Sequence, residues 1–250
     1  MNGHKTIGIL GGMGPNASAD LYQRMLAYAQ KDYGAVQDFD YPPIILYSLP
    51  LAGFDEKGIS DEELVRVQLV KAVQILESAG CELLVIACNT VHYFYDDLQK
   101  SVRIPICNIL EETVKRVKKD KYKKVGLFCS DSTQKTHLYR NACLSQEIDI
   151  IEPSPSQQMV LNDVIEHVMG GNQSADDVAQ LLKITQDYEN QGAEAVVVGC
   201  TEIPLAIQQS DTDMPLIDTT QILAECAVDI SMGSDEAGTD GPAHDMYYRI

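Results

Sequence analysis

The chain has 250 residues, of which 45% are hydrophobic and 22% charged, so it can build one large α/β domain or two small ones. Its formal net charge is -18, because 37 acidic residues outnumber 19 basic ones. An acidic surface repels phosphate backbones, and no apolar run reaches the roughly 20 residues that span a bilayer. We therefore expect neither a nucleic-acid partner nor a membrane partner.

Seven cysteines are spread along the chain in an odd count and without a CxxC pair. This spacing supports neither a zinc knuckle nor a thioredoxin-type redox site, so we expect no metal site. The N-terminus lacks the charged region and the cleavage site of a signal peptide. We predict a cytoplasmic protein with reduced thiols, which are free to do acid–base chemistry.

Short β-rich apolar runs alternate with helical segments along the whole chain. A helix is predicted to begin at Pro15, and Ser60 with Glu63 predicts the capping box of another. Predicted strands occupy residues 5–10, 43–49, 83–87, 104–109, 125–128, 148–151, 195–198 and 215–217. This rhythm predicts the α/β class, with parallel sheets that carry helices on both faces.

The two halves of the chain resemble each other. GCELLVIACNT aligns with GAEAVVVGCTE, RIPICNILEET with DMPLIDTTQIL, and IGILG with VGLFC. Such an internal repeat predicts two Rossmann-like domains related by a pseudo-twofold axis, with an active site in the cleft between them. We assign residues 1–113 and 214–232 to the first domain and residues 114–213 to the second. Residues 233–250, rich in Gly and Asp, are expected to be a flexible acidic tail.

Cys88 and Cys200 occupy equivalent places in the repeat, each directly after a buried strand. Ligands collect beyond the carboxyl ends of parallel strands, so two facing domains would set the thiols on opposite walls of one cleft. Racemisation needs this arrangement, because one group removes a proton from a carbon and another delivers one to the opposite face. Free cysteines are more often small buried hydrophobes, and this interpretation holds for the other five.

Polar residues beside these strand ends are candidates for binding the substrate carboxylate: Asn89, Thr90, Ser130, Thr133 and Thr201. Ser130 and Thr133 are equally well explained as helix caps. The glycine loop of residues 11–14 precedes a helix, whose first N–H groups could bind an anion such as a carboxylate. A tight turn would explain the same glycines, and the G-x-G-x-x-G spacing of dinucleotide sites is absent.

IGILGGMGP, the ACNT-x-H stretch of residues 87–92 and GCTEIPL at residues 199–205 together resemble the aspartate/glutamate racemase superfamily, most closely its aspartate racemase branch. The resemblance runs from about residue 5 to residue 230. It implies a racemase free of pyridoxal phosphate and metal, commonly a homodimer, with Cys88 and Cys200 as the two bases. It also implies that Asn89, Thr90 and Thr133 hold the carboxylate, with Met13 near the substrate.

Two expected side-chain ligands are missing. Aspartate-specific members of the superfamily carry an Arg after the second strand, where this chain has residues 50–57 with Lys57 as the nearest cation. They also carry a Lys at the place of Val160. The substrate could therefore be a neutral amino acid. The same motifs would also fit a related carbanion enzyme, such as a hydantoin racemase or a dicarboxylate isomerase, or a catalytically silent ligand-binding relative.

Overall fold

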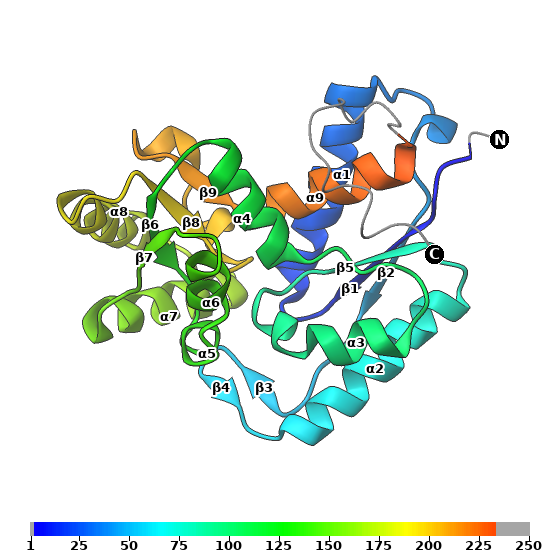
Figure 1. Ribbon diagram of the computed structural model, residues 1–250, viewed down its shortest axis with the longest axis horizontal. Coiled ribbons are helices and arrows are strands. Elements are labelled where there is room, and N and C mark those ends of the chain that lie inside the picture. Colours follow the sequence, from blue (N-terminus) through cyan, green and yellow to red (C-terminus); the bar gives the residue numbers. More distant parts are fainter. Residues whose placement is uncertain (1–2, 234–250) are drawn as a thin grey trace.

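The computed structural model describes residues 3–233, and the predicted tail beyond Gly233 lies outside the described residues. Two lobes are visible in Figure 1, each with its own parallel sheet, and helices α4 (Ile109–Lys119) and α9 (Thr219–Met232) lie between the sheets. The predicted α/β class with two parallel-sheet domains is confirmed.

The first sheet has the strand order β2-β1-β5, with all neighbours parallel. Its strands are β2 (Ile44–Ser48), β1 (Ile7–Gly11) and β5 (Leu83–Ile86). Both β1 and β5 are wholly buried, as their unbroken apolar sequences require of strands covered on two faces. A single parallel bridge between Leu84 and Ile106 extends the sheet beyond β5.

Helices cover both faces of this sheet. Alternate residues of β1 and β5 pack against α1 (Pro15–Tyr33), α4 and α9 on one face. The opposite face packs against α2 (Glu62–Ser78) and α3 (Tyr95–Ser101). The predicted capping box at Ser60 is wrong by one residue, because Asp61 is the N-cap and accepts the N–H of Leu64 at 3.0 Å. An ionised carboxylate also interacts better with the helix dipole than a hydroxyl does.

The second sheet has the order β7-β6-β8-β9 and is also parallel. Its strands are β6 (Lys124–Phe128), β7 (Asp149–Ile151), β8 (Ala195–Val198) and β9 (Leu216–Asp218). Helices α7 (Pro155–Met169) and α8 (Ala175–Asn190) cover one face. Helix α6 (Leu138–Leu144) packs with α4 and α9 on the other, and this layer joins the two domains in one core.

Strand pairing in the two sheets reproduces the repeat seen in the sequence. Leu84 lies beside Ile106 in the first domain, and the aligned pair Val196 and Leu216 lie side by side in the second. The chain therefore returns to the first domain later than residue 214, because β9 completes the second sheet. Helix α9 then packs against α1.

A two-stranded antiparallel hairpin crosses from the first domain to the second. It consists of β3 (Phe54–Asp55) and β4 (Gly58–Ile59) and was not predicted. The Glu56 carbonyl at its tip accepts the N–H of Ser132 at 3.0 Å, so the hairpin is attached to α5 (Asp131–Lys135). Figure 1 shows it bridging the lower edges of the two lobes. None of the helices within residues 3–233 is long and apolar enough to cross a membrane.

The remaining elements are short 3₁₀ helices. They are η1 (Asp38–Asp40), η2 (Thr90–Phe94), η3 (Ile203–Leu205) and η4 (Gln209–Asp211). Two of these, η2 and η3, follow Cys88 and Cys200 by two and three residues. Both thiols thus sit in the short connection between a strand and a helical turn.

Candidate active site

Cys88 lies in the loop between β5 and η2 and is only 5% exposed. Burial raises the pKa of its thiol to about 12, although the backbone N–H groups of Val91 and Thr90 and the Thr90 hydroxyl favour the thiolate. The loop thus surrounds this sulfur with neutral hydrogen-bond donors. Donors of this kind stabilise a thiolate without supplying a charge of their own.

His92 fixes the shape of the Cys88 loop. Its Nε2 accepts the N–H of Ile109 at 3.2 Å, so its Nδ1 carries the proton and donates to the Cys88 carbonyl at 2.9 Å. Burial lowers the pKa of His92 to about 4, which leaves the ring neutral at physiological pH. The histidine is therefore a structural support for the loop and brings no positive charge to the thiol.

Cys200 lies in the equivalent loop between β8 and η3 and is 8% exposed. Burial raises the pKa of its thiol well above the usual range, and the charges of Glu202 and Cys88 raise it further. The Cys200 S–H donates to Oε2 of Glu202 at 3.1 Å, and the Thr201 hydroxyl donates to the same oxygen at 3.1 Å. Since Cys88 acts electrostatically on Cys200, the two predicted catalytic sulfurs belong to one local environment.

Three of the predicted carboxylate ligands form a buried hydroxyl cluster. The hydroxyl oxygens of Thr90 and Thr133 lie 2.6 Å apart, and those of Thr90 and Ser130 lie 3.4 Å apart. Ser130 is also the N-cap of α5, where its hydroxyl accepts the N–H of Thr133 at 3.1 Å. The cluster joins the Cys88 loop of the first domain to α5 of the second, as a ligand held between the domains would require.

Asn89 belongs to a different network. Its Oδ1 accepts the Tyr139 hydroxyl at 2.5 Å, and its Nδ2 donates to the Thr219 hydroxyl at 3.4 Å. Tyr139 also packs under the second thiol loop, because a Cβ on Gly199 would lie 2.7 Å from the Tyr139 ring. Asn89 therefore connects the Cys88 loop to Tyr139, and its side-chain groups are already hydrogen-bonded within the protein.

The glycine loop after β1 meets the site from the first domain. Gly12 has a φ of +99° and lies against the Leu49 backbone, so a side chain has no room there. Met13 is buried in the same apolar cluster as Cys88. The Gly14 N–H, which precedes α1, donates to Oε1 of Glu202 at 3.0 Å. This N–H therefore donates to a carboxyl group of the protein itself, whereas the sequence suggested that N–H groups here could bind an anion such as a carboxylate.

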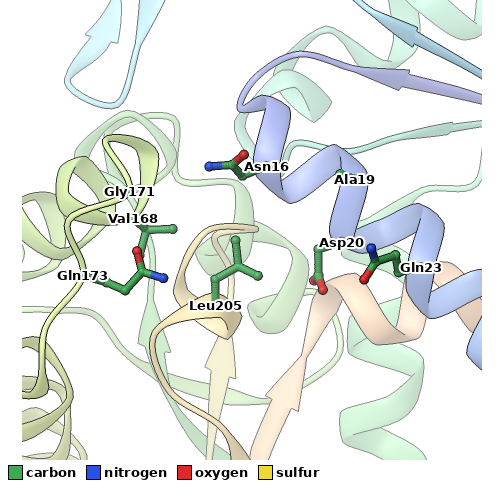
Figure 2. Close-up of a pocket in the computed structure, with 8 residues that line it drawn as sticks. All are labelled: Asn16, Ala19, Asp20, Gln23, Val168, Gly171, Gln173 and Leu205. Atoms are coloured by element: carbon green, nitrogen blue, oxygen red, sulfur yellow. The ribbon is translucent and has the colours of Figure 1, made fainter.

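A pocket of about 410 Å³ opens between the domains beside this loop. Figure 2 shows Asn16, Asp20 and Gln23 of α1 facing Leu205 of η3 and Gln173 of the second domain across it. None of the predicted site residues lines it. Leu205 and Asn16 each lie within three residues of Glu202 or Gly14, so the pocket lies next to the contact that joins the two domains.

The cations closest in sequence to the expected side-chain ligands are engaged elsewhere. Lys57 lies at the tip of the β3–β4 hairpin, where its Nζ is 2.6 Å from a carboxylate oxygen of Glu166, and its side chain is 63% exposed. Arg66 forms ion pairs with three carboxylates, those of Glu62, Glu63 and Asp97. Val160 packs on the apolar core between α7 and the second sheet. Lys57 is thus paired at the surface and Val160 is apolar, so neither supplies the positive charge that was expected for a side-chain carboxylate of the substrate.

No group of three or more His, Cys, Asp or Glu side chains within residues 3–233 is arranged to hold a metal ion.

Residues 10–227 match the Asp/Glu/Hydantoin racemase family, which is most of the chain and includes both thiol loops. The protein therefore belongs to the Asp/Glu/Hydantoin racemase family. The resemblance that the sequence motifs indicated is thereby confirmed.

Individual relatives from this family agree in sequence and in fold. The broad specificity amino-acid racemase RacX of Bacillus subtilis is 28% identical over 222 residues, which cover 89% of this chain and 96% of that protein. The aspartate racemase of Picrophilus torridus superposes with a TM-score of 0.78 at 25% identity, over 92% of this chain and 94% of that one. An aspartate racemase homologue from Pyrococcus horikoshii gives 0.76 at 26% identity, over 92% and 100%.

The roles of three residues of the site were not predicted from the sequence of this racemase-family chain. His92 and Tyr139 were missed because their partners, Ile109 and Asn89, are 17 and 50 residues away along the chain. Glu202 entered the sequence analysis only as part of the GCTEIPL motif. The internal repeat could have identified Glu202, because the alignment sets this ionisable side chain opposite the neutral Thr90.

Proposed function

We propose that the protein is a cofactor-independent amino-acid racemase in which Cys88 and Cys200 are the two bases. The single observation that carries the proposal is the equivalence of the two thiol loops. Each thiol lies two residues after a buried strand of its own sheet, each is almost wholly buried, and the charge of Cys88 acts on Cys200. Two like groups in mirrored positions can work on opposite faces of one α-carbon in either direction.

In the proposed reaction the thiolate of one cysteine takes the α-proton and becomes a thiol. The electron pair of the broken C–H bond passes to the α-carbon and its carboxylate as a carbanion or enolate. The thiol of the other cysteine then gives its proton to the opposite face of that carbon and becomes a thiolate. No atom is gained or lost, and the product is the mirror image of the substrate.

The substrate carboxylate is proposed to bind at the hydroxyl cluster of Thr90, Ser130 and Thr133. This cluster supplies hydroxyl donors from both domains within 3.4 Å of one another, beside the Cys88 loop. Hydroxyl and N–H donors aimed at the carboxylate would also stabilise the charge that develops there when the α-proton leaves. Asn89 and Thr201 would act one step away, through Tyr139 and Glu202 respectively.

We further propose that the substrate has a neutral side chain. Aspartate and glutamate need a cation for the second carboxylate, preferably an Arg that binds it through two hydrogen bonds. In the described part of the chain Lys57 is bound to Glu166 at the surface, and the place of the second expected cation is the apolar Val160.

The remaining parts of the proposal concern assembly and location. Seven free cysteines within the described residues fit a reducing compartment, and we propose the cytoplasm. The homodimer rests on the family resemblance alone, and light scattering of the purified protein at several concentrations tests it. A monomer at every concentration would contradict it.

The test of the function is α-proton exchange in D₂O, followed by NMR for all amino acids in both chiral forms and without added cofactor. We expect exchange and racemisation of neutral amino acids, lost in Cys88→Ser. Cys143→Ala is the matched control, because it removes a buried thiol of α6 that lies outside the site. A folded protein that exchanges the α-proton of no amino acid would overturn the proposal.

A further inference from the structure

The two thiol loops carry different polar residues after the sulfur, Asn89-Thr90 in the first and Thr201-Glu202 in the second. The residue two places after Cys88 is Thr90, and the residue two places after Cys200 is Glu202. The Cys200 thiol donates a hydrogen bond to the Glu202 carboxyl group, and the Thr90 hydroxyl lowers the pKa of Cys88. One thiol therefore has a neutral hydroxyl beside it and the other has a carboxylic acid.

The contacts of Glu202 define its role. Three donors point at its two oxygens: the S–H of Cys200 and the hydroxyl of Thr201 at Oε2, and the N–H of Gly14 at Oε1. Burial raises the pKa of Glu202 above its usual range, although the three donors favour the ionised form. With Glu202 ionised, Cys200 is the donor of the S–H···O hydrogen bond and must keep its proton to make it.

The electrostatic surroundings of Cys200 strengthen this preference. The groups whose charges act most strongly on the Cys200 sulfur are Glu202 on its own loop and Cys88 on the opposite loop, and both are acidic. Gly14 and Thr201, the other neighbours of Glu202, carry no charge. Ionising Cys200 would place a second negative charge 3.1 Å from a buried carboxylate, where the low dielectric weakens screening.

We propose that Glu202 is a positioning residue that holds the proton on Cys200, so that the resting enzyme presents Cys88 as the base and Cys200 as the acid. This inference rests on the proposed racemase function for its kinetic consequence. When the α-hydrogen of the bound enantiomer faces Cys88, the resting enzyme already has the base and the acid on the correct sides of the α-carbon. For the opposite enantiomer, Cys200 must first give up its proton, and this direction should need a higher pH.

Replacing Glu202 by Gln tests the inference, because the amide keeps the size and an acceptor oxygen and removes the charge. A like charge within about 4–6 Å of an ionisable group shifts its pKa by about 1–3 units. Below its pKa, a thiol is alkylated at a rate proportional to its thiolate fraction. We therefore expect Glu202→Gln to speed iodoacetamide alkylation of Cys200 at pH 8–9 about tenfold or more, measured for each cysteine by mass spectrometry.

Two internal comparisons control for accessibility and folding. The charge of Glu202 also raises the pKa of Cys88. Cys88 in the same sample should nevertheless gain less, because the direct hydrogen bond of Glu202 is to the Cys200 thiol, at 3.1 Å. Glu225→Gln should change neither rate, since it removes a half-buried carboxylate that pairs with Arg116 away from the site. Glu202→Asp, which keeps the charge, should leave the Cys200 rate near that of the unmodified protein. Thermal melting identifies any variant that fails to fold.

The kinetic readout separates the two directions of racemisation. In Glu202→Gln the pH profile of kcat/KM should move to lower pH in the direction that uses Cys200 as base, and move less in the other. An unchanged Cys200 alkylation rate, or an equal gain at Cys88, would overturn the inference in an active racemase. A faster Cys200 rate in a protein that racemises nothing would instead support the proton-holding contact and refute the proposed function.

Discussion

The Cys88 loop and the Cys200 loop have the same arrangement. Each thiol follows a buried parallel strand, β5 or β8, and precedes a 3₁₀ helix, η2 or η3. In the first, backbone N–H groups and the Thr90 hydroxyl surround the sulfur. In the second, a buried carboxylate accepts the S–H and is tied to the first domain through Gly14. Burial raises the pKa of both thiols, so the difference teaches that the repeat sets where the sulfurs lie, whereas the neighbouring side chains make their surroundings unequal.

Replacing either Cys88 or Cys200 should produce the largest loss of racemase activity. In the proposed mechanism Cys88→Ser and Cys200→Ser each delete one of two required proton-transfer groups, and such groups typically contribute about 10²–10⁴-fold. We expect racemisation to fall by that factor in both directions, measured by circular dichroism of the amino acid. Retention of more than about a tenth of the activity by either variant would break the symmetry argument.

Tyr139 contacts both thiol loops, through Asn89 in the first and Gly199 in the second. Removing its hydroxyl should lower the free energy of unfolding. Tyr139→Phe leaves Oδ1 of the buried Asn89 without its donor at 2.5 Å, and an unsatisfied buried polar group costs about 1–3 kcal/mol. Urea unfolding measures this difference. Tyr188→Phe is a matched control on α8, where the hydroxyl donates to the Leu127 carbonyl and is remote from Asn89. We expect a similar loss of stability there, with activity reduced only in Tyr139→Phe.

Thr90→Val probes the neutral loop directly. Loss of the hydroxyl removes one hydrogen bond that lowers the pKa of Cys88, and one such bond is worth about 0.5–1.5 kcal/mol. We expect kcat to fall up to about tenfold in the direction that uses Cys88 as base, and alkylation of Cys88 to slow accordingly. Thr136→Val, which removes a hydroxyl at the end of α5, is the control. Equal slowing at Cys200 would contradict the assignment of Thr90 to Cys88.

The smallest effect is expected at Lys57. Its ion pair with Glu166 is exposed to solvent, and pairs of this kind contribute little. Lys57→Gln should leave the thermal midpoint and the range of accepted amino acids unchanged. A selective loss of activity towards aspartate or glutamate would show that this lysine binds a side-chain carboxylate, and would contradict the proposed neutral substrate.

Most of the fold could be predicted from the sequence because the signals are local. Unbroken apolar runs mark strands that are buried on two faces, and the matched runs around Cys88 and Cys200 predict equivalent places in two sheets. Residues from 214 onward were assigned to the first domain, so the pairing of Leu216 with Val196 in the second sheet was missed. The internal repeat aligns this pair with Ile106 and Leu84, which pair in the first domain. Residues 214–232 were predicted to form one unit, whereas β9 and α9 pack in different domains.

The site was less predictable, because its contacts join distant segments. Ser130 and Thr133 come together with Thr90 across 40 and 43 residues. The general rule about strand ends pointed to them, and the family resemblance pointed to Thr90 and Thr133. The N–H groups after the glycine loop were one candidate for binding an anion, with a tight turn as the alternative, and the Gly14 N–H binds a side chain 188 residues away. A helix N-terminus attracts any carboxylate that the fold brings near it, and the sequence alone does not say which one.

The most direct measurement follows deuterium during the first few per cent of racemisation in D₂O. If two different sulfurs serve the two faces of the α-carbon, the newly formed enantiomer should carry deuterium while the unconverted enantiomer keeps its hydrogen. A single base serving both faces would return the original hydrogen to the product or wash deuterium into both forms equally. Either of these patterns would contradict the account.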